Sequence, residues 1–249
     1  MFQGFYNLTS GILTQTRNQN VISNNMTNVS TPGYKSDKYM ATTFREELMY
    51  RSGNIDKSNK TEIGTMAMVR ASDETVTDFE PGAVEETNEI FDVALQDNGF
   101  FMVQTENGIG YTRDGSFILD DQGYLALPSV GRVVGRNGQI RIGTDKIAID
   151  SSGRIFSEDG RTQYGQIAVV DFNNYDNLEK GGNGVFYTNQ QAVAADGKML
   201  WKYLERSNVD SVQEMVNMMS SQRALDSASQ VLKMYDQIMG KVVTEIGKV

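Results

Sequence analysis

The sequence predicts an α+β fold: long N- and C-terminal helices that form a coiled coil, and a central antiparallel β-rich region. At both ends, apolar residues recur with alternating steps of three and four, which is typical of a narrow helical stripe. In the middle they recur at every second position between Gly-containing turns, which is typical of short strands. The expected boundaries are 1–33 for the N-terminal helix, 34–76 for an extended linker, 77–205 for the β-rich domain and 206–249 for the C-terminal helix.

The N-terminal stripe defines one side of the first predicted helix. Its members are Phe5, Leu8, Ile12, Gln15, Gln19, Ile22, Met26 and Val29. Pro32-Gly33 cannot continue a helix and predicts where this one stops. The two glutamines either fix the register of the helix against a partner, as polar seam residues do, or face solvent on a tilted helix.

The C-terminal stripe has the same spacing and continues to the last residues of the chain. Its members are Leu225, Ala228, Leu232, Tyr235, Met239, Val242 and Ile246, with Val212, Met215 and Met219 as expected contact residues upstream, where the spacing is displaced by one residue. Stripes this narrow favour a coiled-coil seam that also contacts neighbouring copies. The alternative is that both helices pack on the domain between them.

The central region contains six pairs of apolar residues at every second position. They are Phe101/Val103, Phe117/Leu119, Leu125/Leu127, Ile140/Ile142, Ile147/Ile149 and Ile167/Val169. Asn-Gly and Asp-Gly steps such as Asn107-Gly108 and Asn137-Gly138 supply the positive φ that tight hairpins need. We expect an antiparallel sandwich or barrel-like module, preceded by a polar linker or weakly ordered extension over 34–76.

Composition lowers the expectation of catalysis. The 249 residues include no His and no Cys, which removes the commonest general base, thiolate nucleophiles and the usual transition-metal ligands. We expect no cofactor and no metal. A net charge of −9 argues against nucleic-acid binding, and no apolar run approaches the roughly 18 residues of a membrane span. The first residues do not form an ordinary signal peptide, which favours a cytoplasmic protein or export by another route.

Two other functions fit the same residues. Paired carboxylates in the β-rich domain could cleave carbohydrate, with the helices as oligomerisation arms, and Trp201 could then be a sugar platform instead of a packing anchor. The chain could also be a surface adhesin or a minor filament protein that uses the same arms. Nothing in the sequence nominates a particular carboxylate pair.

Three blocks of sequence resemble the bacterial flagellar rod and hook proteins. The run VISNNMTNVSTPGYK, from Val21 to Lys35, is similar to their N-terminal signature. Residues 92–101 with 111–117 resemble the central block, and residues 207–224 resemble the C-terminal signature. One departure is Asp97-Asn98-Gly99, where the family usually has Gly-Asp/Glu-Gly.

The resemblance implies a structural subunit of the basal-body rod. Its terminal helices would pair as a coiled-coil inner domain, and the antiparallel β-rich region would form an outer domain. Copies would stack helically around a channel, transmitting torque. The implied partners are further copies of the chain, other axial proteins of the rod and hook, and the flagellar type III export apparatus, with no direct insertion in the membrane. Residues 133–142 resemble proximal more than distal rod subunits.

Overall fold

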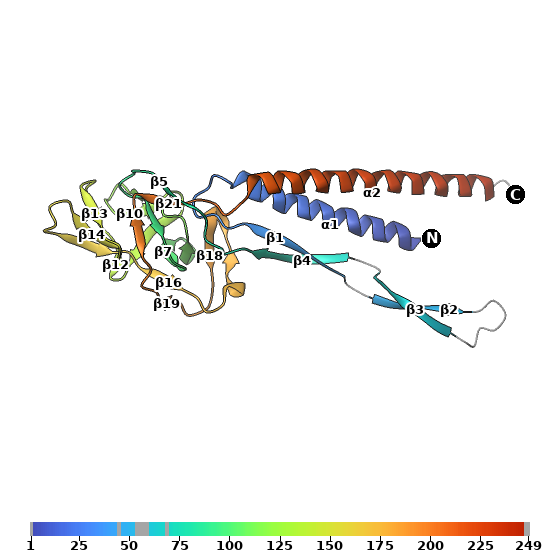
Figure 1. The fold of residues 1–249 in the computed structure, drawn as a ribbon, viewed down its shortest axis with the longest axis horizontal. Helices are drawn as coiled ribbons and strands as arrows, with labels where there is room; N and C mark the ends of the chain where they lie inside the picture. Colours follow the sequence, from blue (N-terminus) through green and yellow to red (C-terminus); the bar gives the residue numbers. More distant parts are fainter. Residues whose placement is uncertain (1, 44–45, 53–59, 68–69, 247–249) are drawn as a thin grey trace. The chain divides into compact units, whose positions relative to one another are not determined.

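A computed structural model describes residues 2–43, 46–52, 60–67 and 70–246 of the chain. The chain divides into two compact units. The terminal unit comprises Met1–Met26, Asp37–Val76 and Ser211–Val249, and the β unit comprises Thr27–Ser36 and Thr77–Asp210. The predicted α+β class is confirmed, with one helix near each end and an antiparallel β-rich centre (Figure 1).

The terminal unit contains the two helices, α1 (Phe2–Thr27) and α2 (Ser211–Ile246). They run antiparallel and side by side, since Gln15 bonds to Ser221 while Asn25, further along α1, bonds to Glu214, earlier in α2 (Figure 1). Helix α1 ends at Thr27, ahead of the predicted stop at Pro32. Within the described ranges, no helix combines the length and apolar character that crossing a bilayer requires.

The segment 34–76 contains strands, where the sequence predicts an extended linker. Strand β1 (Asp37–Thr43) pairs with β4 (Arg70–Thr77), and β2 (Glu46–Ser52) pairs antiparallel with β3 (Lys60–Ala67). Each pair brings a later strand of the segment beside an earlier one. Pairing satisfies backbone N–H and C=O groups that a solitary extended segment would leave to water.

The β unit is built of short strands. Its first strands are β5 (Val84–Glu86), β6 (Val93–Leu95), β7 (Phe100–Thr105), β8 (Gly108–Thr112), β9 (Ile118–Leu119), β10 (Leu125–Leu127), β11 (Gly131–Gly135) and β12 (Gly138–Gln139). Then follow β13 (Ile147–Ile149), β14 (Arg154–Ser157), β15 (Gln163–Gln166), β16 (Val169–Asp171), β17 (Glu179–Lys180), β18 (Val185–Tyr187), β19 (Val193–Ala194), β20 (Met199–Trp201) and β21 (Tyr203–Glu205). Two 3₁₀ turns, Tyr175–Asn177 and Gly182–Gly184, interrupt them.

Strand β7 lies between β8 and β11 in the β unit, and residues from both of its faces contribute to apolar clusters. It pairs with β8, β11 and β16 within a ten-stranded sheet. Phe101 and Val103 point into the larger apolar core, while Phe100 and Met102 belong to a second, aromatic cluster. Because successive side chains of a strand point to opposite faces, β7 contributes residues to two cores.

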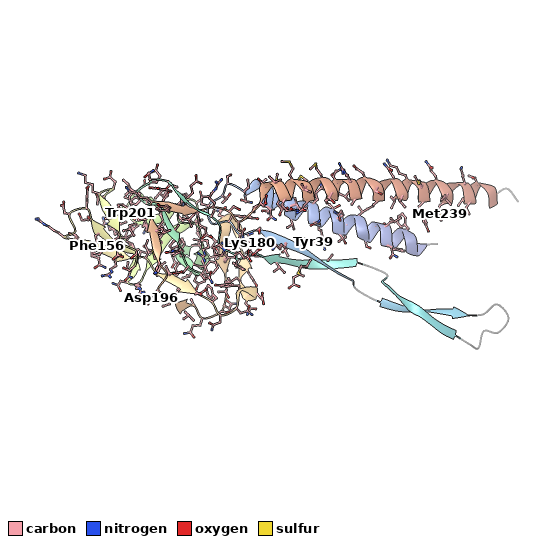
Figure 2. The ribbon with its side chains drawn as sticks, in the orientation of Figure 1. Tyr39, Phe156, Lys180, Asp196, Trp201 and Met239 are labelled. Atoms are coloured by element: carbon pink, nitrogen blue, oxygen red, sulfur yellow. The ribbon has the colours of Figure 1, made fainter. Side chains whose placement is uncertain are left out.

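The larger core contains the residues that the spacing predicts. Of the six apolar pairs, every residue is buried in this core except Leu119, which packs against it half-buried. Trp201 also packs against this core, and its indole Nε1 donates to the Ile90 carbonyl at 2.8 Å, so it is a packing anchor (Figure 2).

The hairpin turns differ slightly from the expected form. Thr105 pairs with Gly108, so Glu106 and Asn107 form the loop, and Gly108 follows them with φ of 118°. The glycine supplies the positive φ, but it closes the turn instead of occupying its tip.

Candidate assembly surface

One side of α1 faces α2 and carries most of the predicted N-terminal stripe. Ile22 is buried, Phe5 is 43% exposed, and the remaining stripe residues within α1 are half-buried, namely Leu8, Ile12, Gln15, Gln19 and Met26. Val29 follows the end of the helix and is half-buried in the β unit. The opposite side of α1 carries Tyr6 and Leu13, which are exposed.

The two stripe glutamines make hydrogen bonds to α2. Gln15 Nε2 donates to Ser221 Oγ at 2.8 Å, and Gln19 Nε2 donates to Gln222 Oε1 at 2.9 Å. Such bonds are directional, so they favour one axial alignment of the two helices over its neighbours.

A further set of α2 residues lies on the side of the helix that approaches α1 at Tyr235, and we call it the inner stripe. Its residues are Leu225, Ala228, Leu232, Tyr235, Met239 and Val242, all half-buried. Ile246 lies in α2, but its side chain is outside the described part of the chain. A Cβ on Gly4 would lie 2.9 Å from Tyr235 Oη, so the glycine allows this tyrosine to approach α1 closely.

A second apolar side of α2 is exposed, and we call it the outer stripe. It comprises Val212, Met215, Val216, Met219, Val231, Met234 and Ile238. Val212 is 71% exposed, Met215 53% and Met219 49%. The structure thus places the three upstream contact residues away from α1, where Glu214 and Ser221 meet that helix instead.

Asn25 is a contact residue that the stripe pattern does not reveal. It is 1% exposed; its Nδ2 donates to the Asp37 carbonyl at 2.9 Å and to Glu214 Oε1 at 3.1 Å, and its Oδ1 accepts from the Asp37 N–H at 3.0 Å. One amide therefore joins α1, β1 and α2. Its only sequence signal is its place in the run that resembles the rod signature.

These features define a class of protein: a structural subunit with two terminal helices that hydrogen-bond to each other through side chains, an exposed apolar stripe and a β unit. Comparison with known proteins agrees. The model described as flagella basal body rod protein matches residues 5–35, the flagellar hook protein FlgE/F/G D1 domain matches 94–165, and the flagellar basal body rod FlgEFG protein C-terminal model matches 202–245.

Full-length relatives give the same result. The flagellar basal-body rod protein FlgG of Bacillus subtilis is 30% identical over 98% of both chains. The flagellar hook-basal body complex protein FlhO of Bacillus subtilis is 30% identical over 100% of both chains, and FlgF of Caulobacter vibrioides is 27% identical over 95% of both.

The chain belongs to the flagellar basal-body rod protein family. It is a structural subunit of the rod, located in the flagellar basal body, and not an enzyme. Family membership selects this function over the carbohydrate-acting enzyme and the adhesin.

Proposed function

We propose that the chain assembles into the rod through its terminal helices, with α2 contacting α1 of its own chain on one side and a neighbouring copy on the other. The observation that supports this is the outer stripe of α2. At 100° per residue, the inner and outer stripes are about 150° apart around the helix axis. A helix with two such faces can contact its own chain with one face and a neighbouring copy with the other, so the assembly is not limited to a single helix pair.

The outer stripe provides the driving force. Full burial of a Val or Met side chain contributes about 1.5–3 kcal/mol, so covering the exposed half of each contributes roughly 1 kcal/mol. Val212, Met215, Val216 and Met219 lie within two helical turns of one another, which concentrates this gain at the start of α2.

In the proposed contact, the two copies contribute different surfaces, and this determines the form of the assembly. An α2 outer stripe that meets a different surface of the next copy is a heterologous contact, which propagates as a helical filament. On this proposal the inner stripe and α1 form a coiled coil within each subunit. The stacked subunits enclose the export channel and transmit torque, and rod and hook proteins and the type III export apparatus are the further partners.

Substitution of Met219 tests the outer stripe. Met219→Asp places a charge in the proposed contact, so we expect rods without this subunit and loss of motility, while the purified monomer keeps its circular dichroism and unfolding midpoint. Ser229→Asp, also exposed on α2 but outside both stripes, is the control and should swim normally. Normal incorporation of Met219→Asp into rods would rule out the outer stripe as the contact.

We further propose a proximal position in the rod, supported by residues 133–142. In the structure this stretch is the β11–β12 hairpin, whose tip residues Arg136 and Asn137 are exposed while Val133 and Ile140 are buried. A photo-crosslinker at Asn137 in purified basal bodies, followed by mass spectrometry, should capture proximal rod subunits. Capture of distal rod or hook subunits alone would place the chain at the other end.

A further inference from the structure

Asn208 joins three segments of the β unit that are far apart in the sequence, namely residues 33–36, 78–82 and 205–208. Its Oδ1 accepts from the Ser36 N–H at 2.8 Å, and its Nδ2 donates to the carbonyls of Asp78 at 2.9 Å and Glu80 at 3.2 Å. Its own N–H donates to the Tyr34 carbonyl at 3.4 Å. All of the amide side chain's polar atoms are thus directed at backbone groups of the other two segments.

A buried charge cluster fastens the same three segments to the central block. Lys35 Nζ lies 2.6 Å from Glu205 Oε1, and Arg113 Nη1 lies 3.3 Å from Glu205 Oε2. All three side chains are at most 3% exposed. The N–H of Gly82 also donates to Glu205 Oε1 at 3.0 Å, and the three ionised residues come one from each block that the family models match.

The cluster holds two cations against one carboxylate, and one backbone carbonyl accepts a hydrogen bond from each cation, while Arg113 Nε is buried without a partner among the described residues. Lys35 Nζ donates to the Glu80 carbonyl at 2.8 Å, and Arg113 Nη1 donates to the Asp97 carbonyl at 2.9 Å. Burial lowers the pKa of Lys35, and the Glu205 carboxylate opposes that shift. An apolar contact tolerates sliding, whereas a buried hydrogen-bonded network is satisfied in one alignment only.

Gly33 seats the first segment directly on the backbone of the central block. Its N–H donates to the Glu205 carbonyl at 2.7 Å, and its φ is +64°. A Cβ at this position would meet the carbonyl carbon of Arg113 and the nitrogen of Asp114. Any side chain would push the segment away from Arg113, so the close contact requires glycine.

We propose that Asn208 and the Lys35–Glu205–Arg113 cluster form a segment lock, which prevents residues 33–36, 78–82 and 205–208 from sliding past one another under mechanical load. Each segment continues along the chain into β1, β4 or α2, so each receives any force applied to those elements. The mechanical part of this proposal rests on the proposed function in a torque-transmitting rod; the lock itself does not.

Hydrogen exchange on the purified full-length chain tests the lock. In Asn208→Ala we expect the amides of Ser36 and Asp78 to exchange at least about tenfold faster, while those of Val103 and Val133 in the core are unchanged. The Asp78 amide is informative because it donates to the Ser36 carbonyl and not to Asn208, so it reports movement of the segments. Asn173→Ala, at an exposed position of the same unit, is the control.

A second variant separates the two roles of the amide. Asn208→Asp keeps an acceptor for the Ser36 N–H but removes both donors, so Asp78 should still exchange faster than in the wild type. Unchanged exchange at Asp78 in both variants would overturn the lock. Equal acceleration of Asp78, Val103 and Val133 would also overturn it, because that result means global destabilisation.

Swimming under load tests the mechanical part. Cells with Asn208→Ala should build rods and swim at low viscosity, but should lose speed relative to the Asn173→Ala control as viscosity rises. Equal speeds at all viscosities, with local opening seen by exchange, would overturn the mechanical part while leaving the lock. Failure of Met219→Asp to affect assembly would instead count against the proposed contact surface alone.

Discussion

Glu205 shows how much depends on single side chains that no local pattern reveals. Its partners Lys35 and Arg113 are 170 and 92 positions away in the sequence, and in the sequence all three are ordinary charged residues. Burial of a charge is unfavourable unless it is paired, so the three residues are placed together by the whole β unit and not by their neighbours. The predicted list of functional residues therefore omits them.

Replacing Glu205 should strongly destabilise the β unit. Glu205→Gln keeps the shape but leaves two buried cations without a counter-charge, and removing one member of a buried ion pair costs about 3–5 kcal/mol. The free energy of unfolding from urea titration measures this. Glu85→Gln is the control, because its pair with Arg206 is 60% exposed on both sides and such pairs contribute about 0–1 kcal/mol. Similar losses in the two variants would contradict the role of burial.

Two aspartates should affect stability with opposite dependence on pH. Burial raises the pKa of Asp114 above its ordinary value of 3.8, whereas the N–H of Tyr124 lowers the pKa of Asp120 below the same value. A raised pKa in the fold contributes stability below 3.8 that is lost as pH rises through the folded pKa. A lowered pKa contributes stability above 3.8 that is lost as pH falls through the folded pKa.

The corresponding amides give the expected signs. At neutral pH, Asp114→Asn should be more stable than the wild type, because Ser116 can still donate to its side-chain oxygen and the buried charge is gone. Asp120→Asn should be less stable, because its bonds from Tyr124 and Arg132 lose charge assistance. Thermal unfolding from pH 3 to 7 checks both, and a common sign at pH 7 would refute the assignment.

At the scale of elements, the sequence predicted that α2 is a helix, but it predicted only in part which side of α2 contacts α1 and which side is exposed. The spacing of Leu225, Leu232 and Met239 predicts a stripe, and these half-buried residues lie on the side of α2 that carries Tyr235, which approaches Gly4 of α1. In the first half of α2, polar residues contact polar residues of α1, for example Ser221 with Gln15. The apolar stripe that begins at Val212 is therefore exposed on another side of α2. That outcome depends on pairing between two helices, which a single-helix pattern does not contain.

Leu232→Asp tests the inner stripe separately from the outer one. A charge on the side of α2 that faces α1 should loosen the helix pair, because two helices of this kind owe their stability to packing. We expect a fall in helical circular dichroism and loss of rod incorporation, with the β unit retaining its unfolding transition. The exposed variant Ser229→Asp should do neither, and a fully helical Leu232→Asp monomer would contradict the pairing.

For the molecule as a whole, the sequence predicted the two ends and the main core, but not how the middle segments are used. Pairs such as Ile147/Ile149 identify the core because alternation is a local property of a strand. Pairing of β2 with β3 follows no strong apolar pattern. The inclusion of Thr27–Ser36 in the β unit depends on Gly33 packing against the Arg113 backbone and on Lys35 pairing with Glu205. Contacts between residues so far apart in the sequence produce no periodic pattern of apolar residues.

Hydrogen exchange along the whole chain should distinguish the free subunit from the assembled one. In the monomer we expect strong protection within 77–205 and fast exchange in both helices, whose outer faces are uncovered. In isolated rods, the amides of α1 and α2 should become protected as neighbours cover them. Strong protection of both helices in a verified monomer would show that their order does not depend on assembly.

The return of residues 33–36 to Glu205 also has a kinetic consequence. A contact between residues 170 positions apart closes a very long loop, and such contacts slow folding because the entropy of loop closure is lost before they form. The β unit therefore cannot form the contacts between residues 33–36 and Glu205 until most of the polypeptide is available. A chain that is delivered from its N-terminus would remain incompletely folded until Glu205 and Asn208 arrive, so its last part sets the moment at which the subunit becomes rigid.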